Sequence, residues 1–93
     1  MSVAATIGSM SAGHCFFPRP TTQGSSNVLI NGLPAHTIGM SWPIHVCGKY
    51  FHASVTAMGS PNVLVNGLPL ARVGDMLSCG DIIASGSPNV LVN

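Results

Sequence analysis

The sequence predicts a small all-β protein made of three β-repeat units that are related by a pseudo-threefold axis. Two observations carry this prediction. The stretch GSPNVLVNGLPLARVGD at 59–75 aligns without a gap to GSSNVLINGLPAHTIGM at 24–40. The chain then ends on GSPNVLVN at 86–93, which is the first half of a third copy. An internal repeat fixes the architecture before any single element is considered.

The start of the chain supplies the missing half of the third copy. ATIGSM at 5–10 resembles ARVGDM at 71–76, and MSVA at 1–4 fills the place that GLPL takes at 67–70. The third unit is therefore split between the two chain ends, which we expect to pair. Three units that close in this way indicate a closed object, because an open solenoid would need polar caps. We treat 1–93 as a single domain.

Within each unit, short β-branched runs flank an Asn-Gly pair, at Asn31-Gly32 and at Asn66-Gly67. Asn-Gly between apolar runs is the strongest local signal for a β-hairpin, because a type I′ turn needs positive φ at both central residues. We therefore expect strand, turn and second strand in each unit. The 11 glycines and 7 prolines, spread over turn positions, argue against any long helix.

Charge is scarce in this chain. Lys and Arg total 3 and Asp and Glu total 2, so no field attracts nucleic acid or anionic lipid. No apolar run approaches the roughly 18 residues of a membrane span, and no signal peptide opens the chain. A chain that is 46% hydrophobic and only 5% charged is expected to cover much of its surface with a partner. The alternative is a sparse surface kept soluble by Ser, Thr, Asn and Gly.

The segments that link the units carry most of the metal-binding chemistry. Two histidines lie six residues after the glycine that ends the repeated part of their unit, and one cysteine lies five after its own. Three matched positions around a threefold axis converge, and imidazole and thiolate suit tetrahedral zinc. A third histidine, on the longest linker, can supply the fourth ligand. The predicted zinc ligands are His14, His45, Cys79 and His52.

Other interpretations of these residues stay open. Cys15 and Cys47 are alternative ligands, and all of these side chains are ordinary polar loop residues if no metal binds. Three cysteines without a signal peptide argue against a disulfide framework. A catalytic zinc would need a general base and a cleft, and Asp75 and Asp81 are the only carboxylates. We expect no enzyme.

The remaining conspicuous side chains are assigned structural roles. His36 aligns with Ala71 in a strand, so we interpret it as structural or solvent-facing. Arg72 and Asp75 are three residues apart and are expected to form an ion pair or to brace a turn. Packing in the core or at an interface is expected for Met10, Met40 and Met76, and partial burial for Trp42.

The repeated GSxNVxxNGxPxAR pattern, with Pro69-Leu70-Ala71-Arg72 after Asn-Gly, resembles the signature of the PAAR-repeat proteins, over the whole chain. The second tetrapeptide, at 34–37, reads Pro-Ala-His-Thr and lacks the arginine. The resemblance implies a β cone with a zinc near its apex, held by three histidines and one cysteine. Matched by position, these are His14, His45, His52 and Cys79.

The resemblance also implies a function. The cone caps the trimeric valine-glycine-repeat-type spike of a type VI secretion system or a related contractile injection machine, one tip per trimer. It sharpens the spike for membrane puncture and helps deliver secreted effectors. Such a protein is assembled in the bacterial cytoplasm and ejected into a target cell, or forms part of a phage-like particle. Because the repeats begin by Ala5 and end at Asn93, we expect a stand-alone tip without a fused cargo domain. The alternative function is a free-standing structural zinc-binding module with another protein partner.

Overall fold

The computed structural model describes residues 2–13, 20–47 and 50–92, and within these ranges it contains strands and no helix. The all-β prediction is therefore confirmed for the described chain. No helix in these ranges is long and apolar enough to cross a membrane. The strands are β1 (Ser2–Ala4), β2 (Leu29–Ile30), β3 (Leu33–Pro34), β4 (Ser41–Cys47), β5 (Tyr50–Val55), β6 (Leu64–Val65), β7 (Leu68–Pro69) and β8 (Ser87–Val92).

The strands form four antiparallel pairs, of which β2–β3 and β6–β7 are the two predicted hairpins. Asn31 and Gly32 have φ of 51° and 82°, and Asn66 and Gly67 have 53° and 82°. Positive φ at both central residues is what a type I′ turn requires, and Asn and Gly tolerate it best. The predicted turns are confirmed. The strands beside them are only two residues long, shorter than the sequence suggested.

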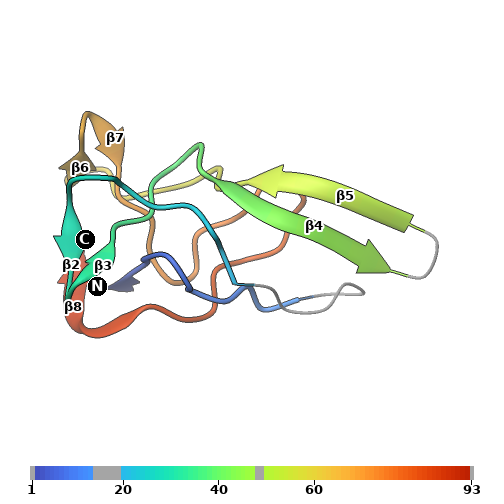
Figure 1. Cartoon of the computed structure of the whole chain (residues 1–93), viewed down its shortest axis with the longest axis horizontal. Helices are drawn as coiled ribbons and strands as arrows, with labels where there is room; N and C mark the ends of the chain where they lie inside the picture. The colour runs from blue at the N-terminus through green and yellow to red at the C-terminus, as the bar shows by residue number, and fades with distance from the viewer. Residues whose placement is uncertain (1, 14–19, 48–49, 93) are drawn as a thin grey trace.

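The two chain ends pair with each other, as the split third unit predicts. Ser2 pairs with Val92 and Val3 with Leu91, through β1 and β8. Equivalent residues of β6 and β7 have the same register. Figure 1 shows both ends beside the hairpins at one end of the molecule. Pairing at the chain ends thus takes the place of a hairpin turn.

Three equivalent residues, one from each repeat, hydrogen-bond in a closed cycle. Ala5 N donates to Ala71 O (2.9 Å), Ala71 N donates to His36 O (2.9 Å), and His36 N donates to Ala5 O (3.1 Å). The neighbouring residues extend the cycle with three isolated bridges that also link different repeats: Ala4 with Arg72, Thr6 with Ala35, and Thr37 with Leu70. Backbone pairing therefore joins all three repeats around one centre.

The core of the described chain consists of two small clusters, and the second of them includes two residues of this cycle. The first contains Ala4, Ala35, Val65, Leu70 and Val92, and the second contains Ala5, Trp42, Ala71, Leu77 and Ile83. Alanine recurs in both clusters because backbones that approach this closely leave little room for side chains. Because the core contains so few large apolar groups, backbone hydrogen bonds contribute much of what holds the repeats in one arrangement.

The longest strand, β4, pairs with β5, and these two strands form a ribbon. Figure 1 shows the ribbon extending away from the hairpins, along the longest dimension of a molecule that measures 37 × 24 × 22 Å. The repeat pattern assigns 40–58 to a linker between two units and predicts no strand there. In the described part of the other two linkers, the equivalent residues form one isolated bridge each, Met10 with Pro20 and Met76 with Ile82, so the repeat gave no signal for strands of this length.

Candidate functional site

The hairpin end of the molecule presents large apolar side chains to solvent. Leu29, Leu64 and Leu91 occupy the same place in the three repeats and are 60%, 60% and 59% exposed. Leu33 and Leu68, in the second strands of the hairpins, are also exposed. We call these five residues the leucine face. Leu33 pairs with Ile30 and Leu68 with Val65, so these two leucines lie on the opposite side of their hairpins from Leu29 and Leu64. Exposed apolar residues that gather at one end of a molecule are typical of protein–protein interfaces.

Strand alternation explains how the leucine face forms. Successive side chains of a strand point to opposite sides. Val65 and Val92, which follow Leu64 and Leu91, are buried in the first core cluster. The leucines must therefore point outward. The outward side of each hairpin also carries a proline, because Leu29 pairs with Pro34 and Leu64 pairs with Pro69.

Hydrogen bonds from the side-chain amides of the turn asparagines join neighbouring repeats at this end. Asn66 Nδ2 donates to Asn27 Oδ1 (2.8 Å) and to Ser25 Oγ (3.2 Å). Asn31 makes the equivalent contacts with Ser87 and Asn89. The third equivalent residue, Asn93, lies outside the described residues. These bonds hold the hairpins in fixed relative positions, which gives the leucine face a defined shape.

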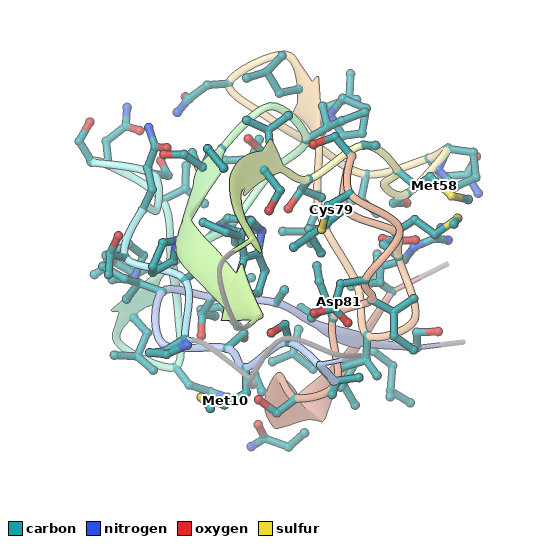
Figure 2. All side chains as sticks on the ribbon, turned by 90° about the vertical axis from the view of Figure 1, so that its right-hand side faces the viewer. Met10, Met58, Cys79 and Asp81 are labelled. Atoms are coloured by element: carbon teal, nitrogen blue, oxygen red, sulfur yellow. The ribbon has the colours of Figure 1, made fainter. Side chains whose placement is uncertain are left out.

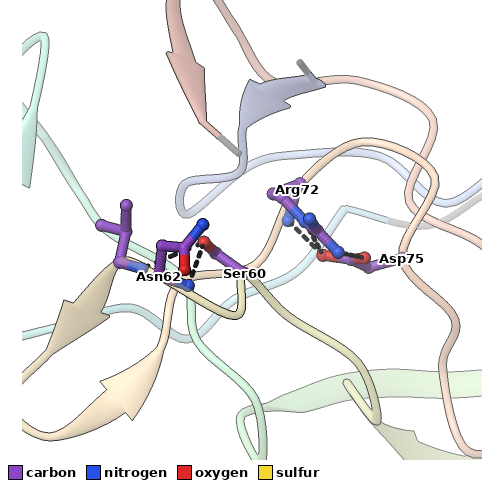
Figure 3. A network of polar contacts seen from close by, with 5 residues as sticks. Ser60, Asn62, Arg72 and Asp75 are labelled. Atoms are coloured by element: carbon purple, nitrogen blue, oxygen red, sulfur yellow. Dashed lines mark hydrogen bonds and ion pairs between the residues drawn. The ribbon is translucent and has the colours of Figure 1, made fainter.

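The Gly-Ser start of each repeat has a packing reason. Ser60 Oγ accepts hydrogen bonds from the backbone N–H of Asn62 (3.2 Å) and Val63 (3.0 Å), and so shapes the turn before β6 (Figure 3). A Cβ added to Gly59 would lie 2.8 Å from Pro69 Cβ. Since real Cβ atoms do not approach this closely, only glycine fits beside the proline of the same repeat.

The predicted ion pair between Arg72 and Asp75 is confirmed (Figure 3). Arg72 Nη2 and Nε donate to the two carboxylate oxygens at 2.8 and 3.1 Å, and Arg72 N donates to Oδ2 at 2.7 Å. The contact with Asp75 raises the pKa of the guanidinium further above its usual range. Asp75 is 3% exposed, so the pair braces the turn and is not available for chemistry.

The structure describes only part of the predicted zinc site. His14 and Cys15 belong to the range that is not described. His45 and His52 are direct partners in the β4–β5 register, but their side chains and that of Cys47 are outside the description. No group of three or more metal-binding side chains is found among the residues that the structure describes.

Cys79 is the predicted ligand whose surroundings are described. It is half-buried and packs against the second core cluster, on a turn that follows Leu77. Figure 2 looks at the ribbon end and shows Cys79 and Asp81 near the middle of the view, whereas Met10 and Met58 lie toward its edge. Met10 and Met76 are exposed, which excludes a core role for both.

Hydrogen bonds connect the Cys79 turn to the segments that carry the predicted histidines. Ser78 N donates to Val55 O (2.8 Å) and Val55 N to Ser78 Oγ (3.1 Å), which joins the turn to the end of β5. On the other side, Ala12 N donates to Ile82 O (2.9 Å), two residues before His14. The backbone therefore brings together the three segments on which the ligands were predicted.

A comparison with known protein families shows which family this chain belongs to. A family model described as the PAAR motif matches residues 18–85, which is most of the chain. The chain belongs to the PAAR-motif family. Proteins with PAAR repeats are spike-tip proteins of type VI secretion systems. The comparison with curated proteins found no match.

The two carboxylates of this PAAR-motif protein accept hydrogen bonds from backbone N–H groups. Asp75 accepts from Arg72 N, and Asp81 accepts from Gly13 N and Ile82 N. Both residues are 3% exposed. A buried carboxylate that holds backbone donors is poorly placed to act as a general base for a bound substrate. The PAAR-motif family is a structural family and not an enzyme family.

His36 replaces the alanine that the other two repeats have at this position, and it is fully buried. Its interpretation as structural is confirmed, while a solvent-facing position is wrong. The ring meets Trp42 edge to face, with centroids 5.4 Å apart, and Trp42 is buried more deeply than predicted. Burial lowers the pKa of His36 from its usual 6.5, against the opposing effect of a hydrogen bond with Gln23 O. The alanines at the equivalent positions were the available signal for burial.

Proposed function

We propose that this chain is the spike-tip protein of a type VI secretion system or a related contractile injection machine. The observation that carries the proposal is the PAAR-motif match over residues 18–85, since proteins with PAAR repeats are spike tips. The protein caps the trimeric valine-glycine-repeat-type spike and narrows its end. It is assembled in the cytoplasm and ejected with the spike, and effectors that associate with the spike are delivered with it.

A cone with pseudo-threefold symmetry suits this role. Two features support the symmetry: the closed cycle of backbone bonds through Ala5, His36 and Ala71, and the equal exposure of Leu29, Leu64 and Leu91. A pseudo-threefold chain presents three similar surfaces to three spike chains. One copy therefore covers one trimer.

The leucine face is the surface that we assign to the spike. It lies at the broad hairpin end in Figure 1, opposite the β4–β5 ribbon. The blunt end of a three-stranded β-helix exposes unpaired N–H and C=O groups and apolar side chains, which such a face covers. With 3 Lys and Arg and 2 Asp and Glu in the whole chain, docking depends on apolar burial and backbone pairing, so salt affects it little.

A structural zinc ion at the ribbon end completes the proposal. His14, His45, His52 and Cys79 would hold it. Hydrogen bonds connect the Cys79 turn to β5 and to residues 11–13, which supports the proposal that the three ligand-bearing segments lie close together. Imidazole and thiolate are ligands that suit zinc. The ion ties together segments that the small core stabilises poorly. A rigid, narrow end then transmits the thrust of the contracting sheath to a small area of the target membrane.

Binding to the cognate spike tests the leucine face. We expect Leu29→Asp with Leu64→Asp to weaken binding to the purified trimeric spike by at least about 100-fold, because each leucine removes roughly 1.5–3 kcal/mol of apolar burial. Met58→Asp is the matched control, since Met58 is 46% exposed and lies outside the leucine face. Equal loss for both variants, or none for either, would contradict the assignment of this face. Tight binding of the wild-type chain to another protein but not to the spike would favour a free-standing zinc module.

A further inference from the structure

The carboxylate of Asp81 joins two segments at the ribbon end. Gly13 N donates to both of its oxygens, at 3.0 and 3.1 Å, and Ile82 N donates to Oδ1 at 2.8 Å. Asp81 is 3% exposed. Hydrogen bonds from backbone N–H to a buried carboxylate are stronger than those to a neutral oxygen. The contact with Gly13 is therefore a firm link between residues 68 positions apart in the chain.

This link ends a short antiparallel run. Ala84 N donates to Met10 O (2.8 Å) and Ala12 N donates to Ile82 O (2.9 Å), with a bridge between Ser11 and Ile83. At Gly13, the next residue along this run, the hydrogen-bond acceptor is the Asp81 carboxylate and not a backbone carbonyl. Gly13 has a φ of 83°, which favours glycine, so the chain changes direction where the carboxylate holds it.

The position of this link matters for the proposed zinc site. Gly13 directly precedes His14, and Asp81 follows Cys79 by two residues. Because consecutive Cα atoms are about 3.8 Å apart, the Cα atom of Cys79 lies within roughly 8 Å of that of Asp81. A hydrogen bond at this place sets how the two segments approach each other.

We propose that Asp81 is a positioning residue for the zinc site. It holds the segment with His14 against the turn with Cys79, so that two ligands from opposite ends of the sequence are in place before the metal binds. The inference rests on the proposed zinc site and adds a residue that is not itself a ligand. Residues that orient metal ligands typically change metal affinity by about 10–100-fold.

Zinc competition with a chromophoric chelator tests this on the full chain. We expect Asp81→Asn to bind one Zn²⁺ with about 10-fold weaker affinity than wild type, because the neutral amide holds Gly13 less firmly. The Co²⁺-loaded variant should also show altered thiolate-to-metal and d–d absorption, which a loss of stability alone does not change. Asp75→Asn is the matched control. Asp75 is equally buried and also accepts a backbone N–H, yet it links no proposed ligand segment. Its zinc affinity should equal that of wild type.

The outcomes separate this inference from the zinc site itself. Wild-type zinc affinity and an unchanged Co²⁺ spectrum in Asp81→Asn would overturn the role of Asp81 and leave the site intact. A wild-type chain that binds no Zn²⁺ would overturn both. If Asp81→Asn does not fold, Asp81→Glu keeps the charge and displaces the acceptor, and we expect a 3- to 10-fold loss of affinity in that variant as well. Wild-type affinity in Asp81→Glu would overturn the proposal.

Discussion

His36 Nε2 lies 2.7 Å from Thr56 Oγ1 in the interior of the protein, and Trp42 Nε1 donates to the same hydroxyl at 2.8 Å. On its other side, His36 Nδ1 lies 2.8 Å from Gln23 O, which can only accept. Nδ1 therefore carries the proton, and Nε2 accepts from Thr56. Each hydrogen of this buried network has one acceptor when the imidazole is neutral.

The first prediction concerns the pH dependence of stability. A native-state pKa below 6.5 means that the unfolded chain binds more protons as the pH falls, so the free energy of unfolding decreases below pH 6.5. The slope should reach at most about 1.4 kcal/mol per pH unit from this residue. Release of metal from protonated ligands acts in the same direction.

His36→Ala isolates this contribution, because the other two repeats already have alanine there. We expect the variant to lose about 2–3 kcal/mol at pH 7.5, since Gln23 O and Thr56 lose their partner. Between pH 7 and 5, however, its stability should fall less steeply than that of wild type. Urea unfolding at several pH values measures both quantities. Parallel pH profiles would contradict the role of His36.

The second prediction concerns the Asp75 turn. In the third unit, which is split between the chain ends, Thr6 N donates to Ser9 Oγ (3.0 Å), where the unit at 59–75 has Arg72 N and Asp75. Asp75→Ala should lower the free energy of unfolding by about 2–3 kcal/mol, because it leaves the part-buried N–H of Arg72 without this acceptor and removes the ion pair. Asp75→Ser keeps a hydrogen-bond acceptor, so its free energy of unfolding should fall by about 1 kcal/mol less than that of Asp75→Ala. Equal unfolding free energies for the two variants would show that the turn does not depend on this hydrogen bond.

The third prediction concerns the paired chain ends. A permutant that joins 93 to 1 and opens between Ser85 and Gly86 should fold, because β8 and β1 already pair. Met1→Gly in this permutant copies the Asn66-Gly67 turn and should raise its melting temperature. Deletion of 90–93 removes the buried Val92 and half of a strand pair, and should cost more than about 3 kcal/mol. Thermal melts of the three proteins provide the test, and a truncated chain that melts like wild type would contradict it.

The fourth prediction distinguishes the proposed zinc ligands from their neighbours. His45→Ala and Cys79→Ala should lose the bound zinc and unfold readily, since structural zinc contributes strongly to folding. Cys15→Ala and Cys47→Ala should each retain one zinc ion per chain. Elemental analysis of the purified variants measures this directly. Loss of zinc in Cys47→Ala with retention in Cys79→Ala would transfer the ligand role to Cys47.

The sequence was most informative where local chemistry decides structure. The Asn-Gly turns and the pairing of the chain ends follow from turn preferences and from the repeat, and the Arg72–Asp75 pair follows from spacing around a turn. The β4–β5 ribbon was missed because the repeated pattern does not extend into the linkers, which differ in sequence and length. The burial of His36 depends on Trp42 and Thr56, which arrive from outside its own repeat. The pattern NVLVN also does not say whether valine or leucine faces the core.

The mass of the complex between this chain and its cognate spike tests the central claim most directly. If three equivalent surfaces of one chain cover three spike chains, native mass measurement should give one copy of this protein per spike trimer. The complex should persist in about 0.5 M salt, where interactions between exposed charges are screened. Three copies per trimer, or dissociation in that salt, would contradict the spike-tip account.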